Sequence, residues 1–158
     1  MRYSEKTKTW DDNWNDVVRY LFKDERLKDL MCIPNGTSII NFTDKYFIED
    51  QNADEIMTDE KVRIVYYDSE GRDTGNKNVF NRYKEFDIYV KNDSLHNATE
   101  DRLKKRYKLI AERLKFLLTK DYHICGIHFE CDDPGYNLYT KTVGYKRYHI
   151  VFRYKTTV

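Results

Sequence analysis

The sequence predicts an α+β fold, a mostly antiparallel sheet of about four to five strands packed against two main helices, in the order α-β-β-α-β-β. Two segments repeat apolar residues at helical spacing, and several shorter segments alternate apolar with polar residues. The connections between the alternating segments are mostly short, which favours antiparallel pairing. No repeat or linker-like segment interrupts the 158 residues, so we expect one domain over residues 1–158.

The first element is a helix over residues 9–22, because its apolar residues form one helical stripe. Thr9 is the expected N-cap. A second, shorter stripe around Leu27 and Leu30 predicts a kink followed by one or two further turns, which Pro34 and Gly36 end. The first stripe consists of Trp10, Trp14, Val17, Val18, Leu21 and Phe22.

Strands follow in the middle of the chain. Short strands are expected at residues 39–42 and 46–48, before a polar loop at residues 50–55. The β-branched and aromatic segment 61–67 is a clear strand candidate, and residues 83–90 alternate in the same way. The polar stretch between these two strands predicts a hairpin with a long loop at about residues 68–82.

The second main helix is expected over residues 99–119, capped by Asn97 or Thr99. Residues 123–131 then read as a strand, residues 132–135 as a turn, and residues 145–154 as a last strand. A sheet with one covered face fits the alternation, because strands buried on both faces would read as continuous apolar runs. The helical stripe consists of Leu103, Tyr107, Ile110, Ala111, Leu114, Leu117 and Leu118, and the opposite face is rich in lysine.

The charge of the chain is balanced overall but not along its length. The formal net charge is +1, which argues against strong general attraction to nucleic acid or to an anionic membrane. Residues 101–158 hold 13 Lys and Arg against 6 Asp and Glu, whereas residues 1–100 hold 15 against 21. A protomer with two oppositely charged halves is suited to head-to-tail stacking with its copies, although scattered surface charge that only solvates the domain gives the same count.

Neither a disulfide framework nor a metal site is expected. Three cysteines are an odd number without paired spacing, which favours a reducing compartment. His123, Cys125, His128 and Cys131 resemble a zinc cluster, but on one extended strand they do not converge on a point. No apolar run is long enough to cross a bilayer, and the amino-terminal residues lack the hydrophobic region of a signal peptide. We therefore expect an intracellular or virion protein that does not contact a membrane.

No familiar catalytic motif occurs, so we expect neither catalytic residues nor a cofactor. Glu85, Asp87 and Lys91 resemble the acid-acid-lysine pattern of metal-dependent nucleases, but both acids fall on the wet face of a strand. The 14 tyrosines are more informative, because tyrosine is enriched at protein interfaces. Aromatic side chains also line platforms that bind single-stranded nucleic acid.

The order of elements resembles the tail terminator proteins of tailed bacteriophages, which complete the tail and join it to the head. The matching segments are residues 10–31, 61–67, 83–93, 99–119 and 145–155. The resemblance implies a homo-hexameric ring at the head–tail junction of the virion, assembled in the host cytoplasm. Its implied partners are further copies of the chain, the tail tube protein and the neck or connector protein, without a specific nucleic acid. It also implies work by shape, not catalysis.

Interface residues are expected in three places. By the resemblance, the 68–82 loop, with Arg72, Asp73 and Lys77, is an axial contact, and the charged face of the second helix, with Lys104, Lys105 and Lys108, touches other subunits or the neck. Tyr136 and Tyr139 are the third candidate contact. Two alternative functions stay open: a nucleic-acid-binding module with a tyrosine-rich sheet, and a small phage-encoded adaptor or inhibitor of a host protein.

Overall fold

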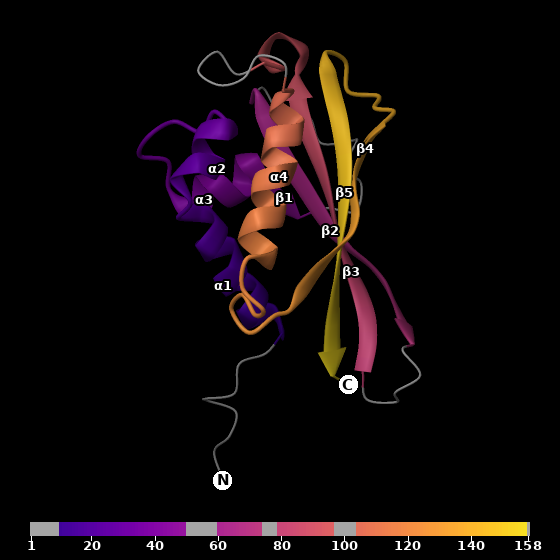
Figure 1. Cartoon of the computed structure of the whole chain (residues 1–158). Helices are drawn as coiled ribbons and strands as arrows, with labels where there is room; N and C mark the ends of the chain where they lie inside the picture. Colours follow the sequence, from indigo (N-terminus) through magenta and orange to yellow (C-terminus); the bar gives the residue numbers. More distant parts are fainter. Residues whose placement is uncertain (1–9, 50–59, 74–78, 97–103, 158) are drawn as a thin grey trace.

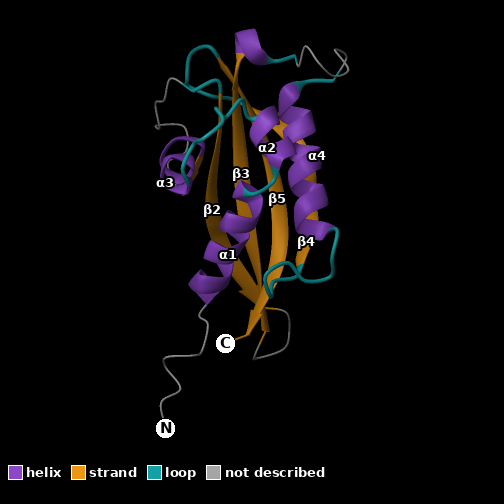
Figure 2. Cartoon of the chain, turned by 90° about the vertical axis from the view of Figure 1, so that its left-hand side faces the viewer, coloured by secondary structure: helices purple, strands orange, loops and turns teal. Residues whose placement is uncertain are grey.

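The computed structural model describes residues 10–49, 60–73, 79–96 and 104–157. Within these residues one five-stranded mixed sheet carries helices on one of its faces, which confirms the α+β class (Figures 1 and 2). The strand order is β1-β2-β3-β5-β4. The elements in chain order are α1 (Trp10–Phe22), α2 (Glu25–Leu30), α3 (Ile39–Asn41), a π-helix (Phe42–Tyr46), β1 (Phe47–Glu49), β2 (Val62–Asp73), β3 (Val79–Lys91), a 3-10 helix (Asn92–Ser94), α4 (Arg106–Thr119), β4 (Phe129–Leu138) and β5 (Tyr145–Thr157).

The amino-terminal part is more helical than the α-β-β-α-β-β order predicts. The expected kink after the first helix lies at Asp24. The Asp24 carboxylate accepts a hydrogen bond from the Leu27 N–H at 2.8 Å and so caps α2. The strand expected at residues 39–42 is wrong, because Ser38 caps a helical turn there by accepting the Asn41 N–H. The strand expected at residues 46–48 is confirmed as β1, which pairs with β2 in parallel.

The long loop expected at residues 68–82 is wrong. β2 continues to Asp73 and β3 begins at Val79, and the two strands pair along this length with one irregularity between Ser69 and Arg72. β5 supplies the other side of β3, with Val79 opposite Thr157. Pairing satisfies the backbone N–H and C=O groups, so a polar segment stays extended without an apolar face. Residues 74–78 lie outside the described part.

α4 begins at Arg106 and not at the expected cap near residues 97–99, which lie outside the described residues. Lys105 is extended and pairs with His96 in an isolated bridge. The buried Arg106 guanidinium donates to the carbonyl of Ser94 at 2.7 Å and to that of Leu30 at 2.9 Å. These bonds tie the start of α4 to the end of α2, and the helix begins where they hold it.

The turn expected at residues 132–135 is also wrong. The strand expected at residues 123–131 is wrong before Phe129, because a tight turn lies there, in which Ile124 and Ile127 exchange backbone hydrogen bonds. β4 then runs through residues 132–135 and pairs with β5 across two irregularities on either side of Asp133. Proline and β-bulges are common on edge strands, where they discourage pairing with another chain. Gly135 has φ +130°, and a β-carbon there would lie 2.3 Å from the Tyr148 ring, so the strand passes directly over that ring.

The core lies between the helices and the sheet. The stripe residues of α1 and α4 whose side chains the structure describes are buried there as expected, with Phe22 partly buried, and they pack against alternate residues of β2, β3 and β5. Trp10 and Leu103 are outside this comparison. Within the described residues, no helix is both long and apolar enough to cross a bilayer. The buried aromatic group at the centre comprises Trp14, Phe42, Phe47, Tyr66, Phe86, Phe129, Phe152 and Tyr154.

Candidate functional site

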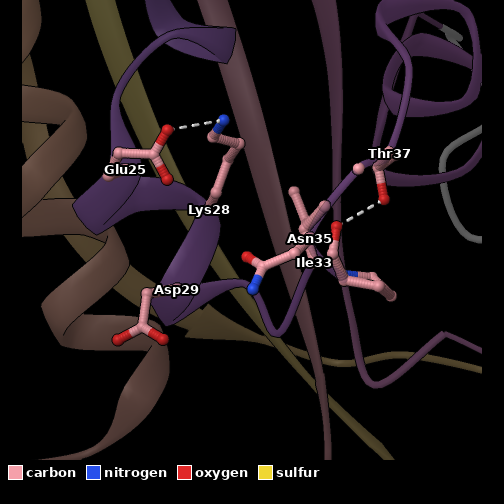
Figure 3. Close-up of a pocket in the computed structure, with 8 residues that line it drawn as sticks. Glu25, Lys28, Asp29, Ile33, Asn35 and Thr37 are labelled. Atoms are coloured by element: carbon pink, nitrogen blue, oxygen red, sulfur yellow. Dashed lines mark hydrogen bonds and ion pairs between the residues drawn. The ribbon is translucent and has the colours of Figure 1, made fainter.

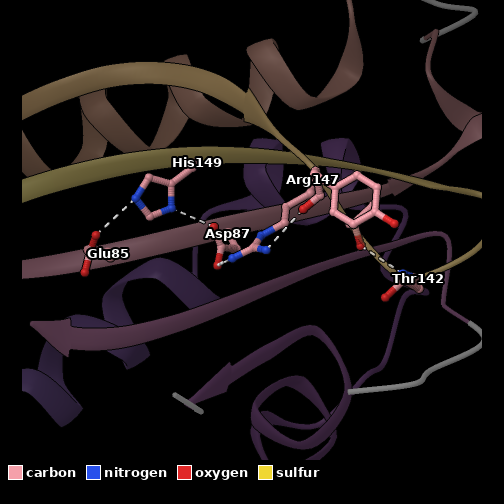
Figure 4. Close-up of polar contacts among 7 residues, drawn as sticks. Glu85, Asp87, Thr142, Arg147 and His149 are labelled. Atoms are coloured by element: carbon pink, nitrogen blue, oxygen red, sulfur yellow. Dashed lines mark hydrogen bonds and ion pairs between the residues drawn. The ribbon is translucent and has the colours of Figure 1, made fainter. Parts of the chain in front are cut away.

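The face of the sheet that carries no helix holds a buried network of charged side chains (Figure 4). Glu85 and Asp87 are on β3, and Arg147 and His149 are on β5, with Asp87 directly opposite His149. His149 Nδ1 lies 2.6 Å from Asp87 Oδ1, and His149 Nε2 lies 3.1 Å from Glu85 Oε1. Arg147 donates to the other Asp87 oxygen at 2.9 Å. Two acids therefore alternate with two bases along this face.

This arrangement favours a protonated His149. Burial opposes the charge, but the hydrogen bond to Asp87 and the negative charges of Asp87 and Glu85 outweigh it and raise the His149 pKa above its usual value. Both ring nitrogens then donate to carboxylates, so neither is free to accept a proton from a substrate. The fully buried Asp87 in turn needs both partners, because an uncompensated buried carboxylate is costly. The geometry thus fits a structural clamp between β3 and β5.

Two tyrosines border this network. The Tyr136 ring on β4 lies 5.4 Å from the His149 ring, between their centroids. Burial and the negative charges of Asp87 and Glu85 raise the pKa of Tyr67, so its hydroxyl keeps its proton. The rim of the network is therefore aromatic.

The nuclease-like pattern of Glu85, Asp87 and Lys91 does not form a metal centre in this arrangement. Both carboxylates are engaged by His149 and Arg147, whereas a divalent cation needs their oxygens as ligands. Among the residues that the structure describes, no group of three or more His, Cys, Asp or Glu is placed to hold a metal ion. The three cysteines, Cys32, Cys125 and Cys131, form no disulfide.

The expected loop contacts lie at the end of a paired strand. Arg72 and Asp73 are the last residues of β2, where it pairs with β3, and Lys77 lies outside the described residues. Arg72 and Asp73 are therefore part of a paired strand instead of a long loop.

The three expected lysines do not form one uniform face. Lys108 is exposed on α4, and Lys104, just before the helix, is exposed with its Nζ 3.9 Å from a Glu112 carboxylate oxygen. Lys105 is half-buried, and its Nζ lies 3.3 Å from His96 Nε2. Lys104 and Lys108 remain available on the outer surface, whereas Lys105 helps to fix the start of α4.

Tyr136 and Tyr139 lie close to the charged network. Their exposed fractions are 45 % and 82 %, and the Tyr139 carbonyl accepts a hydrogen bond from Arg147 at 3.3 Å. Tyr139 also lines a groove of about 410 Å³ with Lys146 and Arg147. The sequence pointed to the tyrosines but not to the network, and the expected position of both acids on a solvent-exposed strand face is wrong for Asp87, which is fully buried. The signal of the network is present as acids at alternate positions of one strand and bases at alternate positions of another, but only the pairing of β3 with β5 brings them together.

A second hollow, of about 340 Å³, lies between α2 and the loop that follows it (Figure 3). Two local contacts lie in its lining: Lys28 is 3.0 Å from Glu25 within α2, and the Thr37 hydroxyl donates to the Pro34 carbonyl at 2.7 Å in the loop. They do not converge on the centre of the hollow.

Comparison with known protein families and curated sequences found no relative. The sequence matches no model of a known protein family, and no curated protein sequence matches it.

Proposed function

We propose that this chain is a structural subunit of a tailed-bacteriophage virion, a tail terminator that forms a ring between the tail tube and the neck. The observation that carries the proposal is the length of the central strands. β3 and β5 have 13 residues each, or about 43 Å, whereas the 14 residues of α4 span about 21 Å. The ends of β2, β3 and β5 consequently extend past the helices as an arm (Figure 1).

An arm of this kind suits assembly by contact. Its strands are tied to the domain through β3, which pairs on both sides, so the arm continues the sheet of the domain. A ring subunit needs such an extension to reach its neighbours or the tube, and it needs no bond-making chemistry. Arg72 and Asp73, at the end of β2, are the arm residues that we expect at this contact.

The test is the form of particles that are made without this chain. We expect tails of abnormal length, or tails that are not attached to heads, in negative-stain electron micrographs. Supplying the wild-type chain should restore normal particles. A variant in which an Asn-Gly turn replaces residues 70–82 should not, whereas Val143→Glu, an exposed change far from the arm, should. Normal attached tails without the chain would contradict the proposal.

A second candidate function is binding of single-stranded nucleic acid. The observation that favours it is the groove beside Tyr139, where Lys146 and Arg147 stand next to an exposed aromatic ring. Tyr89, by contrast, is fully buried and cannot stack on a base. This candidate predicts salt-dependent binding of a fluorescent oligonucleotide that Tyr139→Ala weakens. Unchanged anisotropy at low salt would discard it.

A further inference from the structure

A groove of about 510 Å³ lies at the β1 edge of the sheet, between α1, the π-helix and β1. Its apolar lining consists of Val18 and Phe47, which are buried, and Ile48, which is partly exposed, beside the polar Asn15 and Thr43 and the exposed carboxylates of Asp44 and Glu49. The groove therefore combines a partly apolar floor with a negatively charged rim. Such a combination fits an apolar side chain that has cations beside it.

The outer surface of α4 carries a side chain of this type. Phe116 is 51 % exposed, although a large aromatic ring is usually covered. The Arg113 guanidinium lies 5.0 Å from the centre of its ring, and the Lys120 ammonium lies 5.9 Å from it. Lys115, the preceding residue, is exposed too. We call this set, Arg113, Lys115, Phe116 and Lys120, the Phe116 patch.

We propose that the Phe116 patch of one copy docks into the β1-edge groove of a second copy. Phe116 enters between Asp44 and Glu49, whose charges face Lys115 and Lys120. The inference rests on the proposed ring function and names the contact between neighbouring subunits. It also gives a physical role to the negative and positive halves of the chain, since the groove belongs to residues 1–100 and the patch to residues 101–158.

The positions of the two surfaces suit a head-to-tail contact between copies better than a two-fold dimer. The groove is at β1, one edge of the sheet, whereas α4 contacts β4, at the other edge, more than it contacts any other strand. When two copies join through different surfaces, the pair still has one free groove and one free Phe116 patch. Further copies can therefore be added in the same way. Closure of that series gives a ring. Because the rim and the patch are exposed, salt should weaken the contact.

The experiment is sedimentation velocity on the purified chain and its variants at low salt, up to about 0.5 mM, a range that detects Kd values near 1 mM. The wild-type chain should self-associate. Phe116→Glu keeps the groove but loses the patch, and Asp44→Lys/Glu49→Lys keeps the patch but loses the groove. Each variant alone should sediment as the 19.2-kDa monomer.

The decisive sample is an equal mixture of these two variants. It contains one intact groove and one intact patch, so we expect a 1:1 heterodimer and nothing larger. Val143→Glu is the matched control, because it replaces an exposed apolar side chain with a charged one, as Phe116→Glu does, but on the β4–β5 connection. It should leave self-association unchanged. Circular dichroism checks that each variant is folded.

Three results would overturn the inference: a wild-type chain that stays monomeric, variants that self-associate like the wild type, or a mixture that forms no heterodimer. Self-association that these substitutions do not affect would refute this pairing of surfaces and leave the ring proposal standing. The ring proposal itself is judged by the form of the particles.

Discussion

Replacing His149 should change both the stability of the chain and its dependence on pH. In the wild type the imidazolium links Asp87 to Glu85 across β3 and β5, at 2.6 Å and 3.1 Å. In His149→Gln the neutral amide can donate to one carboxylate, but it turns its oxygen toward the other. Hydrogen bonds to charged groups contribute about 1.5–3 kcal/mol each, so we expect a loss of about 3 kcal/mol at pH values where His149 is protonated.

The direction of the pH effect follows from the raised His149 pKa. The folded state binds the proton more tightly than the unfolded state, so the stabilisation is complete below the unfolded pKa of about 6.5. It is lost as the pH rises through the folded-state value. The difference in unfolding free energy between wild type and His149→Gln should therefore shrink at alkaline pH.

The assay is urea unfolding followed by tryptophan fluorescence, to which the buried Trp14 contributes, at intervals between about pH 5.5 and pH 8.5. His123→Gln is the matched control, because His123 is exposed and outside the network. It should keep the wild-type pH dependence. A wild-type stability that rises with pH over this range, or a His149→Gln variant with an unchanged slope, would refute the reasoning.

Three further predictions concern stability in the same urea assay. Leu114→Ala, at a fully buried position of α4, should cost about 2–5 kcal/mol; a cost near zero would place α4 away from the core. Gly135→Ala should cost about 1–3 kcal/mol through overlap with the Tyr148 ring, and Tyr148→Ala in the same chain should reduce that cost. Asp24→Asn keeps the α2 cap but loses the ion pair with Arg113 at 2.7 Å, whereas Asp24→Ala loses both and should cost about 1 kcal/mol more; equal costs would contradict the capping role.

Asp24 should also make the stability of the chain depend on pH in the acid range. Burial raises its pKa, but the Arg113 hydrogen bond and the Leu27 N–H lower it more, so the pKa lies below its usual value. The stabilisation from this carboxylate is present at neutral pH and is lost as the pH falls through the folded-state pKa. Asp24→Asn should therefore approach the wild-type stability in acid.

The elements with a local signal could be predicted from the sequence. The buried stripes of α1 and α4 repeat every three to four residues, and the alternation of β5 begins at Tyr145 as expected. Both signals reflect one covered face. Both signals depend only on residues that are close together in the sequence, so they can be recognised without knowing which distant segments pair.

The remaining features depend on partners far away in the chain. Polar residues 68–73 are strand because β3 and β5 pair beside them, and Gly135 belongs to β4 because it passes over Tyr148. α4 begins late because Arg106 bonds to the Leu30 carbonyl. The charged network was missed for the same reason. Glu85 and His149 are 64 residues apart, and only the pairing of their strands makes them neighbours.

The most direct test of assembly by shape is the position of this chain in the intact particle, measured by electron cryomicroscopy. We expect a closed ring of identical copies between the end of the tail tube and the neck, with Phe116 of each copy against the β1 edge of the next. A map that places the chain elsewhere, or that shows it as an isolated copy, would contradict the account.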